Sequence, residues 1–443
     1  MTAQTLEPQQ ADEYARHLSQ VNKKNQVLAT EDIFNEQGAL LVKKGTPLSE
    51  QLAERVIRHK LTQPLEHSVN LSNMIDAGRL RKGFEQLFEQ YPDCRQVHQE
   101  LRLQIRLEEN CREYTRFPLL MQKLTVLAMQ RPHDYQKGLF CAWMALALGQ
   151  QMQLETGQVT AVFLAGLMHD TGMLHISTDI LEKEGELTTE EWRAIQSHPR
   201  IGELFLRNVP GLAPEVARAT LEHHERRDGT GYPGGRFAES LSTEGQVIAI
   251  ADSLCAIRML RLSERGGNLA SAIPILQINV RGYDPDAYRA AVAVIRAGEL
   301  RVPRLVEDAR MPAFIDGLLA MYERLNRCFA GVSDVVGQLP EESPNGKIRS
   351  AALLAQHAWF AVASSGLLSQ SLKHWISLVK KNHEQDHYAN MEEVDVLQQE
   401  VRWQLVQLRK ALNTLHSERV LAGAESAALL ELALESLQAL DTP

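Results

Sequence analysis

Apolar residues recur at three- and four-residue spacing along most of the chain from Leu71 onward. The stretches LRKGFEQLFEQY (80–91) and VHQELRLQIRLEENCREYTRF (97–117) show this spacing clearly. It gives a helix one continuous apolar face that a neighbouring element can bury. The pattern predicts a mainly α-helical protein, in which residues 70–120 form a helical connector.

The pattern is different in residues 22–69, where short apolar runs are separated by turn residues. QVLAT (26–30) and GALLVKKGT (38–46) are typical of short strands, and they are joined by EDIFNEQ. PLSEQLAERVIRHKL (47–61) predicts a helix with Ser49 at its N-cap. We therefore expect a small α/β module here. The polar residues 1–21 before it are expected to form a flexible tail.

Residues 291–443 predict a helical C-terminal extension. Its clearest feature is a single apolar stripe made by Val394, Leu397, Val401, Leu405, Leu408, Leu412 and Leu415. Two hypotheses follow from this stripe. It packs against its own domain, or it forms a coiled-coil seam that makes a homodimer through the C-terminal helices.

The composition narrows the class of protein. Aromatic residues make up only 6%, and leucine and alanine dominate the apolar set, which favours helix. A net charge of −9 argues against a protein that binds nucleic-acid polymers, because those need a basic surface. The five cysteines are scattered, and no apolar run approaches the ~20 residues that span a bilayer. We expect a cytoplasmic protein without membrane insertion.

Four short segments carry residues that bind metals. They are LAGLMHDTG (164–172), IQSHPRIG (195–202), HHERRDGTGYP (223–233) and VIAIADSL (247–254). Each histidine or aspartate alone is more simply a helix cap or a polar core residue. Together they form a set of four histidines and two aspartates: His169, Asp170, His198, His223, His224 and Asp252.

Neutral imidazole and carboxylate are ligands for divalent metals, and six such groups are enough for two ions. A carboxylate such as Asp170 is able to bridge two ions. Two neighbouring metals suit the in-line hydrolysis of a phosphate ester. The set therefore predicts a metal centre acting on a phosphate ester.

These motifs resemble the HD-GYP family, a branch of the HD-domain metal-dependent phosphohydrolases. HDTG matches the family's HDxG, and ILEKEGELTTEEW (180–192) matches its ILxKPGxLTxEEW. His198 with Gly202 matches HxxxG, HHERRDGTGYP matches HHExxDGxGYP, and IAD (250–252) matches VAD. The resemblance runs over about 165–255 and implies an HD-GYP helical-bundle core over residues 121–290.

The resemblance implies a cyclic di-GMP phosphodiesterase that uses a metal-activated water. The six residues above would then hold two divalent ions of Mn, Fe or Mg, with Asp170 also counted as catalytic. Gly229, Gly231, Tyr232 and Pro233 would form the substrate-binding loop. Glycine permits positive φ and close backbone approach, proline fixes the loop, and tyrosine stacks on or hydrogen-bonds a nucleotide.

The chain departs from the family at the lysine that follows HDxG and at the first ligand histidine. Met173 stands where the family has a lysine after HDxG, so an arginine is expected to replace that cation. We assign this role to Arg226, with Arg200, Arg227 and Arg236 as alternatives. Lys137 stands where the family has its first ligand histidine. Either His133, one turn earlier, serves instead, or Lys137 places a cation at the metal site.

The leading interpretation is thus a metal-dependent cyclic di-GMP phosphodiesterase. The alternative is a catalytically degenerate HD-GYP protein that serves as a cyclic di-GMP receptor or a protein-interaction module, which Met173 and Lys137 favour. A different phosphohydrolase of the HD superfamily is a third reading, against which the intact GYP loop argues.

Overall fold

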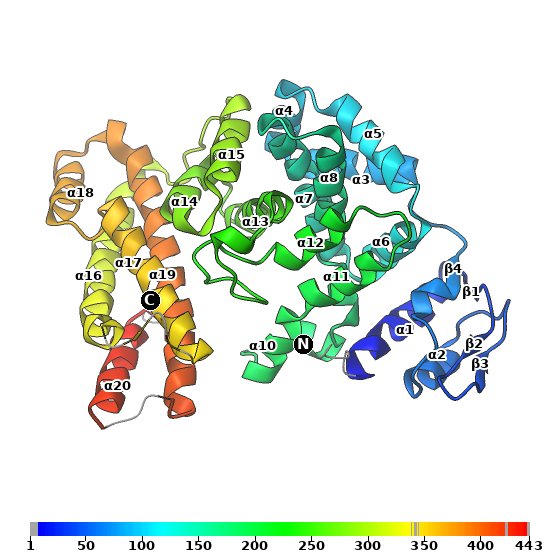
Figure 1. The fold of residues 1–443 in the computed structure, drawn as a ribbon. Coiled ribbons are helices and arrows are strands. Elements are labelled where there is room, and N and C mark those ends of the chain that lie inside the picture. The colour runs from blue at the N-terminus through cyan, green and yellow to red at the C-terminus, as the bar shows by residue number, and fades with distance from the viewer. Residues whose placement is uncertain (1–7, 338, 341–342, 344, 421–423, 441–443) are drawn as a thin grey trace.

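The computed structural model describes residues 8–337, 339–340, 343, 345–420 and 424–440, and these are predominantly helical (Figure 1). The prediction of a mainly α-helical protein is confirmed. Buried apolar side chains form two separate cores. One core runs from the N-terminal module through the centre of the molecule, and the other belongs to the C-terminal helices.

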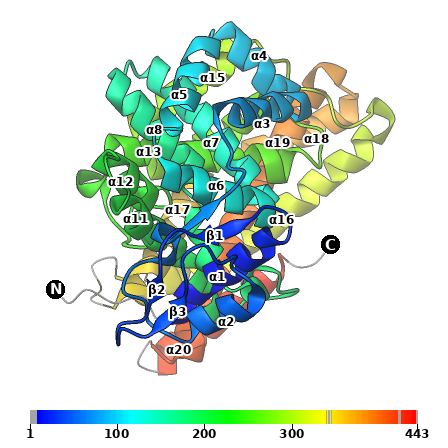
Figure 2. The ribbon, with the colours of Figure 1, turned by 90° about the vertical axis from the view of Figure 1, so that its right-hand side faces the viewer.

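The N-terminal module contains two small antiparallel sheets, formed by the pairs β1–β4 and β2–β3. Its elements are α1 (Pro8–Asn22), β1 (Val27–Ala29), β2 (Ile33–Phe34), β3 (Leu40–Val42), α2 (Glu50–Ile57), η1 (Leu65–His67) and β4 (Val69–Leu71). Helix α2 begins after Ser49, whose side chain accepts a hydrogen bond from the Leu52 amide, as predicted. Figure 2 shows α1 and α2 together beside these strands.

The prediction of a flexible tail is wrong for residues 8–21, and residues 1–7 lie outside the described residues. Helix α1 packs against α2, α6 and η2. Its Tyr14, Leu18 and Val21 side chains are buried in the first core. The polar look of this segment arises because the helix buries only one face. The module therefore begins with α1.

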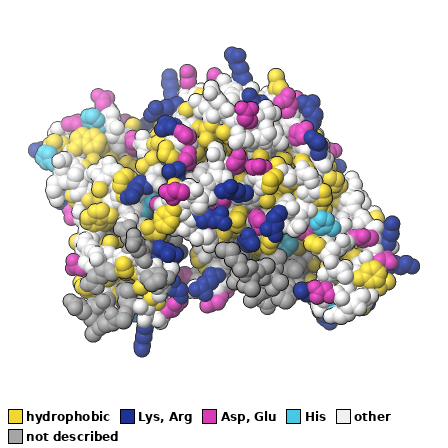
Figure 3. Space-filling view, in the orientation of Figure 1, with side chains coloured by type: hydrophobic (Ala, Val, Ile, Leu, Met, Phe, Trp, Pro, Cys, Tyr) yellow, Lys and Arg dark blue, Asp and Glu magenta, His cyan; other side chains and the backbone are white. Residues whose placement is uncertain are grey.

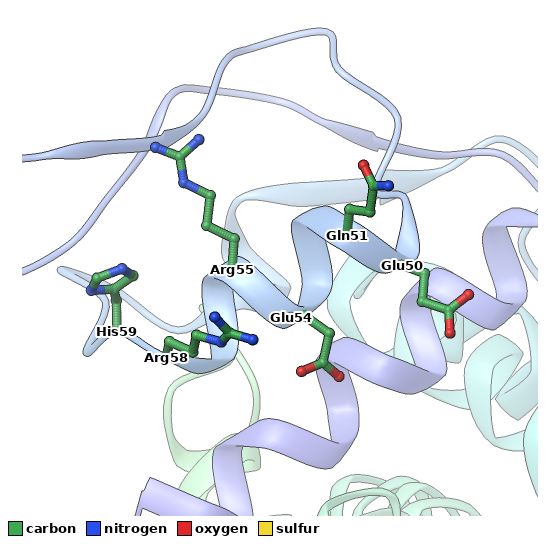
Figure 4. Close-up of a pocket in the computed structure, with 6 residues that line it drawn as sticks. All are labelled: Glu50, Gln51, Glu54, Arg55, Arg58 and His59. Atoms are coloured by element: carbon green, nitrogen blue, oxygen red, sulfur yellow. The ribbon is translucent and has the colours of Figure 1, made fainter.

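A shallow cavity lies on the outer side of α2 (Figure 4). It is lined by Glu50, Gln51, Glu54, Arg55, Arg58 and His59. Two of these side chains bind other parts of the module: Arg55 donates to the Leu40 carbonyl at 3.1 Å, and Glu54 accepts from Arg16 at 3.1 Å. The charged residues here thus help to hold the module together.

The central region is built around α7 (Pro132–Gln151) and α8 (Thr156–Met168), which are apolar nearly all round and deeply buried. The connector supplies α3 (Ala77–Gln90), α4 (Pro92–Glu100), α5 (Gln104–Tyr114) and α6 (Pro118–Gln130). After α8 come η2 (Thr171–His175), α9 (Thr178–Leu181), α10 (Thr189–Gln196), α11 (His198–Arg207), α12 (Pro214–Glu222), η3 (Ala238–Ser240) and α13 (Thr243–Ala256).

Helix α13 continues into a π-helical segment, η4 (Ile257–Leu262). It is followed by η5 (Leu269–Ala272), α14 (Ile273–Ile278), η6 (Val280–Gly282) and α15 (Pro285–Ala297). Helix α15 crosses the predicted boundary at residue 290, because Ala291, Val294 and Ile295 are buried in the first core. The central region therefore extends beyond residue 290.

The second core is made by long C-terminal helices, drawn at the left of Figure 1. They are preceded by η7 (Asp308–Arg310) and comprise α16 (Met311–Val336), α17 (Gly346–Ser365), α18 (Gln370–Asn382), η8 (Gln385–His387), α19 (Tyr388–Ser417) and α20 (Ala424–Gln438). The predicted stripe lies on α19, which packs against α16, α17 and α20. The hypothesis that the stripe packs against its own domain is thus confirmed. A homodimer stays a prediction, and this stripe does not support it.

Within the described residues, no single helix has both the length and the apolar character needed to cross a membrane, although α17 and α18 together, bent by 54°, meet those two criteria.

On the coloured part of the face shown in Figure 3, basic and acidic side chains are interspersed.

Replacing Leu18 by alanine should test whether α1 belongs to the core. The side chain is fully buried, so Leu18→Ala is expected to lower the free energy of unfolding by about 2–5 kcal/mol. The exposed Gln20→Ala on the same helix should change it by no more than about 0.5 kcal/mol. Thermal or urea denaturation measures both. Equal, negligible effects would show that α1 does not pack on the module.

Candidate metal centre

Four helices bring the six predicted ligands to one place. His169 and Asp170 follow the last turn of α8, His198 begins α11, His223 and His224 follow α12, and Asp252 lies within α13. These helices pack on one another at the centre of the molecule (Figure 1). His224 is partly exposed, and the other five residues are buried. The fold thus gathers the six predicted residues from across 84 positions of the chain, and their role as metal ligands stays a prediction.

Asp170 is the central member of the cluster. Its Oδ1 lies 3.3 Å from Nε2 of His198 and 4.0 Å from Nε2 of His223. Its Oδ2 lies 3.3 Å from Nε2 of His169. Asp252 joins the cluster at the other side, 3.6 Å from Nε2 of His169 and 3.4 Å from Nδ1 of His224. All six side chains thus converge.

Three of the imidazoles are oriented by the backbone three residues before them. Nδ1 of His169, His198 and His223 lies 2.6–2.8 Å from the carbonyl oxygens of Gly166, Ile195 and Thr220. A carbonyl accepts only, so Nδ1 carries a proton in each ring, and Nε2 points into the cluster, where it presents a lone pair when the ring is neutral. This is the arrangement that metal-binding histidines use.

Among the described residues, the Nε2 lone pairs of His198 and His223 have no hydrogen-bond donor opposite them. Nε2 of His198 and Nε2 of His223 face each other at 3.2 Å, so two acceptors meet. Nε2 of His169 and Oδ1 of Asp170 are buried without a hydrogen bond. Such groups are costly to bury unless a cation satisfies them. The donor set therefore fits a divalent metal ion.

The ligand atoms fall into two groups whose members lie within 4.8 Å of one another. One contains Asp170, His198, His223 and His224, and the other contains His169, Asp252 and Cys141. Sequence reasoning missed Cys141. It lies one turn after Lys137 on α7, so its spacing of four residues from the family's ligand position was the available signal.

Lys137 reaches the same cluster, where its ammonium binds Oδ2 of Asp170. Burial disfavours the charged lysine, but the carboxylates of Asp170, Asp252 and Asp134 outweigh it and raise its pKa well above the usual value. Burial likewise opposes charge on Asp170, and His169 and Lys137 lower the pKa of this carboxyl well below its usual range. The lysine thus places a permanent positive charge at the centre.

The histidines respond to their surroundings in opposite ways. Burial and the neighbouring His169 lower the pKa of His223 to about 3, which leaves this imidazole neutral. For His169 burial acts in the same direction, but the carboxylates of Asp170 and Asp252 raise its pKa to about 10. A metal at His169 must therefore displace a proton.

His133 lies away from the cluster, contrary to the first of the two possibilities for this helix. Its side chain is 57% exposed, and its Nδ1 lies 3.8 Å from Oδ1 of Asp134. The α-helix runs unshifted from Pro132, so position 137 faces the cluster and position 133 faces solvent. Of the two possibilities, the structure favours a cation at the site.

The loop after His224 covers one side of the cluster. Gly229 has a φ of +76°, and a Cβ at Gly231 would overlap the carbonyl oxygen of His224. The Tyr232 ring lies 4.5 Å from the His224 ring, centroid to centroid, and the Tyr232–Pro233 peptide bond is cis. The two glycines therefore allow the positive φ and the close backbone approach that were expected of them. The tyrosine lies beside the predicted ligands.

Glu225 holds this loop in place and was not singled out in the sequence. Its buried carboxylate accepts hydrogen bonds from the amides of Gly234, at 2.6 Å, and Arg236, at 2.9 Å. The signal was its place in the HHE motif, directly after the two histidines. Glu225 is a structural part of the site, because it fixes where the loop returns.

The four arginines proposed to replace the missing lysine have partners of their own. Arg226 donates to the carbonyls of His223 and Glu225 and to Oγ of Ser253, at 2.9–3.3 Å. The other three form ion pairs, which are Arg200–Glu203, Arg227–Asp284 and Arg236–Glu222. A phosphate contact by Arg226 stays a prediction, whereas Lys137 already contacts the cluster.

Comparison with known proteins agrees with this geometry. Residues 120–287 match the family described as HD domain. Cyclic di-GMP phosphodiesterase PA4108 of Pseudomonas aeruginosa is 32% identical over 180 residues, which are 41% of this chain and 44% of that protein. The cyclic di-GMP phosphodiesterase response regulator RpfG of Xanthomonas campestris pv. campestris is 30% identical over 173 residues, or 37% and 46% of the two chains.

A third relative is the 3'3'-cGAMP-specific phosphodiesterase 3 of Vibrio cholerae, 35% identical over 127 residues, which are 28% of this chain and 27% of that protein. The chain thus spans less than half the length of these relatives. The central region thus resembles an HD domain over residues 120–287. Its ordered motifs, from HDTG to GYP and IAD, are similar to those of the HD-GYP type.

Removal of the central carboxylate should remove the metal. Wild-type protein reconstituted with Mn and then desalted is expected to hold at least about one equivalent, measured by elemental analysis. Asp170→Ala should lose most of it, because Asp170 lies between three imidazoles. Asp179→Ala, an exposed carboxylate on α9, is the matched control. Less than about half an equivalent in the wild type would contradict the metal centre.

Proposed function

We propose that this protein is a metal-dependent phosphodiesterase that hydrolyses cyclic di-GMP. The observation that carries the proposal is the convergence of His169, Asp170, His198, His223, His224 and Asp252, with the Nε2 atoms of three imidazoles facing inward. Two of the relatives described above, PA4108 and RpfG, are named cyclic di-GMP phosphodiesterases. We assign the same activity to this protein as part of the proposal.

The metal-binding residues are the six named above, with Cys141 beside His169 and Asp252. A divalent ion bound there supplies Lewis-acid charge to a phosphoryl group and lowers the pKa of water. Two ions of Mn, Fe or Mg are proposed. Lys137 binds Oδ2 of Asp170, so a second ion held by Asp170 would have to compete with this ammonium.

The remaining residues bind and orient the nucleotide. Gly229, Gly231 and Pro233 shape the loop, and the Tyr232 ring lies next to His224, where it offers a face for a guanine base. Lys137 and Arg226 are the nearby cations proposed to receive negative charge on the phosphate. Asp170 is proposed to be catalytic because it orients the ligands around the reacting phosphorus.

The substrate class has one close competitor. The relative from Vibrio cholerae described above is named a 3'3'-cGAMP-specific phosphodiesterase, so both cyclic dinucleotides belong in the assay. A cytoplasmic location is part of the proposal. It is supported by the five cysteines, which are buried and form no disulfide among the described residues.

A second function has an observation of its own. The Lys137–Asp170 ion pair neutralises the central carboxylate without a metal, and Met173 supplies no charge after HDTG. These two features favour a receptor that binds cyclic di-GMP and does not hydrolyse it. Turnover separates the two functions, because the receptor binds and gives no product.

The direct test is to incubate Mn- or Fe-reconstituted protein with cyclic di-GMP or 3'3'-cGAMP and to separate the products by chromatography. Hydrolysis of cyclic di-GMP at the higher kcat/KM is expected. Tyr232→Ala should raise KM about tenfold and leave the metal content unchanged, because tyrosine contributes stacking and not ligation. Loss of metal together with nucleotide affinity would mean that Tyr232 is structural.

The two departures from the family generate a further prediction. Lys137→His replaces a competing ammonium by a ligand and should raise bound metal by about one equivalent. Met173→Lys alone should change turnover little, since Lys137 still occupies Asp170. The double variant should gain about thirty- to a thousand-fold, corresponding to roughly 2–4 kcal/mol from a positioned cation.

Steady-state hydrolysis and elemental analysis of the two single variants and the double variant measure these changes. If all three bind metal and cyclic di-GMP but stay at background turnover, the phosphodiesterase proposal fails and the receptor function replaces it.

A further inference from the structure

The loop that covers the metal centre is bound by a side chain from the second core. His357 lies on α17, in the C-terminal helical region, 129 residues after Asp228 of the HHERRDGTGYP loop. Its Nδ1 lies 2.7 Å from Oδ2 of Asp228. The two side chains are only 14% and 16% exposed. The C-terminal helices therefore contact the loop through a largely buried polar pair.

The opposite ring nitrogen of His357 is also fixed. Nε2 lies 2.9 Å from Oδ1 of Asn279, which also accepts from Nε2 of Gln404 at 2.9 Å. Nδ2 of Asn279 donates to the Ile275 carbonyl and to Glu400, at 2.9 and 2.8 Å. These four contacts determine which atom of the Asn279 amide is the oxygen. His357 thus faces an oxygen atom at each ring nitrogen, so the orientation of the ring is fixed from both sides.

The Asp228 carboxylate divides its two oxygens between the loop and α17. Oδ1 accepts from the amide of Thr230 at 3.1 Å and from its hydroxyl at 2.6 Å, which closes the turn at Gly229. Oδ2 faces His357. Burial opposes the charge of Asp228, but the bonds from His357 and Thr230 lower its pKa to about 2. The carboxylate is therefore ionised and well placed to hold the turn.

The loop leads directly from this turn to the residues expected to bind substrate. Only Thr230 and Gly231 separate the turn at Gly229 from Tyr232, and the Tyr232 amide donates to the His224 carbonyl at 3.1 Å. On the metal side, His223 and its neighbours keep their own backbone contacts, such as Nδ1 of His223 to the Thr220 carbonyl. A change at Asp228 should thus move the loop more than the ligands.

We propose that His357 is a positioning residue, through which the C-terminal helical region holds the HHERRDGTGYP loop in its substrate-binding position by way of Asp228. This rests on the proposed function of the same site. It assigns a role to the C-terminal helices, which form a hydrophobic core separate from the one that surrounds the metal centre. By holding this loop, the C-terminal helices determine the affinity for substrate and do not affect metal binding.

The experiment compares His357→Ala with His374→Ala, an exposed histidine on α18. His357→Ala should raise KM for cyclic di-GMP about tenfold and change kcat less than about twofold, with metal content unchanged. His374→Ala should behave as the wild type. His357→Gln, which keeps the bulk and one donor, replaces His357→Ala if that variant folds poorly. It is expected to raise KM about threefold. Equal KM values in wild type and His357 variants would overturn the proposal.

A double-mutant cycle tests whether His357 acts through Asp228. The effect of His357→Ala on KM should largely vanish in an Asp228→Ala background, because the partner is already lost. A purely structural role of His357 would instead give effects that multiply, and that result would contradict the proposal.

Hydrogen–deuterium exchange tests the same contact without nucleotide. His357→Ala should speed exchange of the amides in residues 228–235 and leave those of α12 and α13 unchanged. Unchanged exchange in the loop would overturn the role of His357. If the wild type neither binds nor hydrolyses cyclic di-GMP, the proposed function fails, while the exchange result still decides whether His357 holds the loop.

Discussion

The buried carboxylate of Asp170 is the charge around which the centre of the molecule is arranged. Burying an ionised group is costly unless opposite charges and hydrogen bonds compensate it. Here three imidazoles and the Lys137 ammonium surround it, each delivered by a different part of the chain. The packing of the apolar helices α7 and α8 offsets this cost, because it holds Lys137 beside Asp170.

Lys137 gives this centre its particular character. A metal ion and a lysine ammonium both neutralise a carboxylate, but only the metal also satisfies the lone pairs of His198 and His223, which face each other. The lysine therefore compensates the charge of Asp170 and leaves the imidazoles unsatisfied. This explains why the cluster fits a metal although a cation is already present.

The sequence predicted the parts of the protein that short motifs encode. The six residues of the cluster and the Ser49 cap were recognised from short motifs and local spacing. Helix α1 was missed because only one of its faces is apolar and the packing partner is distant in sequence. The contact between His357 and Asp228 could not be predicted from the sequence either. The two residues are 129 positions apart, and no sequence motif links them.

The most direct test of the account is a crystal structure of the full chain soaked in Mn, with an anomalous difference map. A metal peak is expected among Oδ1 of Asp170 and the Nε2 atoms of His198 and His223, within about 2.0–2.3 Å of each. Lys137 should remain on Oδ2 of Asp170. A map without a peak at Asp170, despite Mn bound elsewhere, would contradict the metal centre.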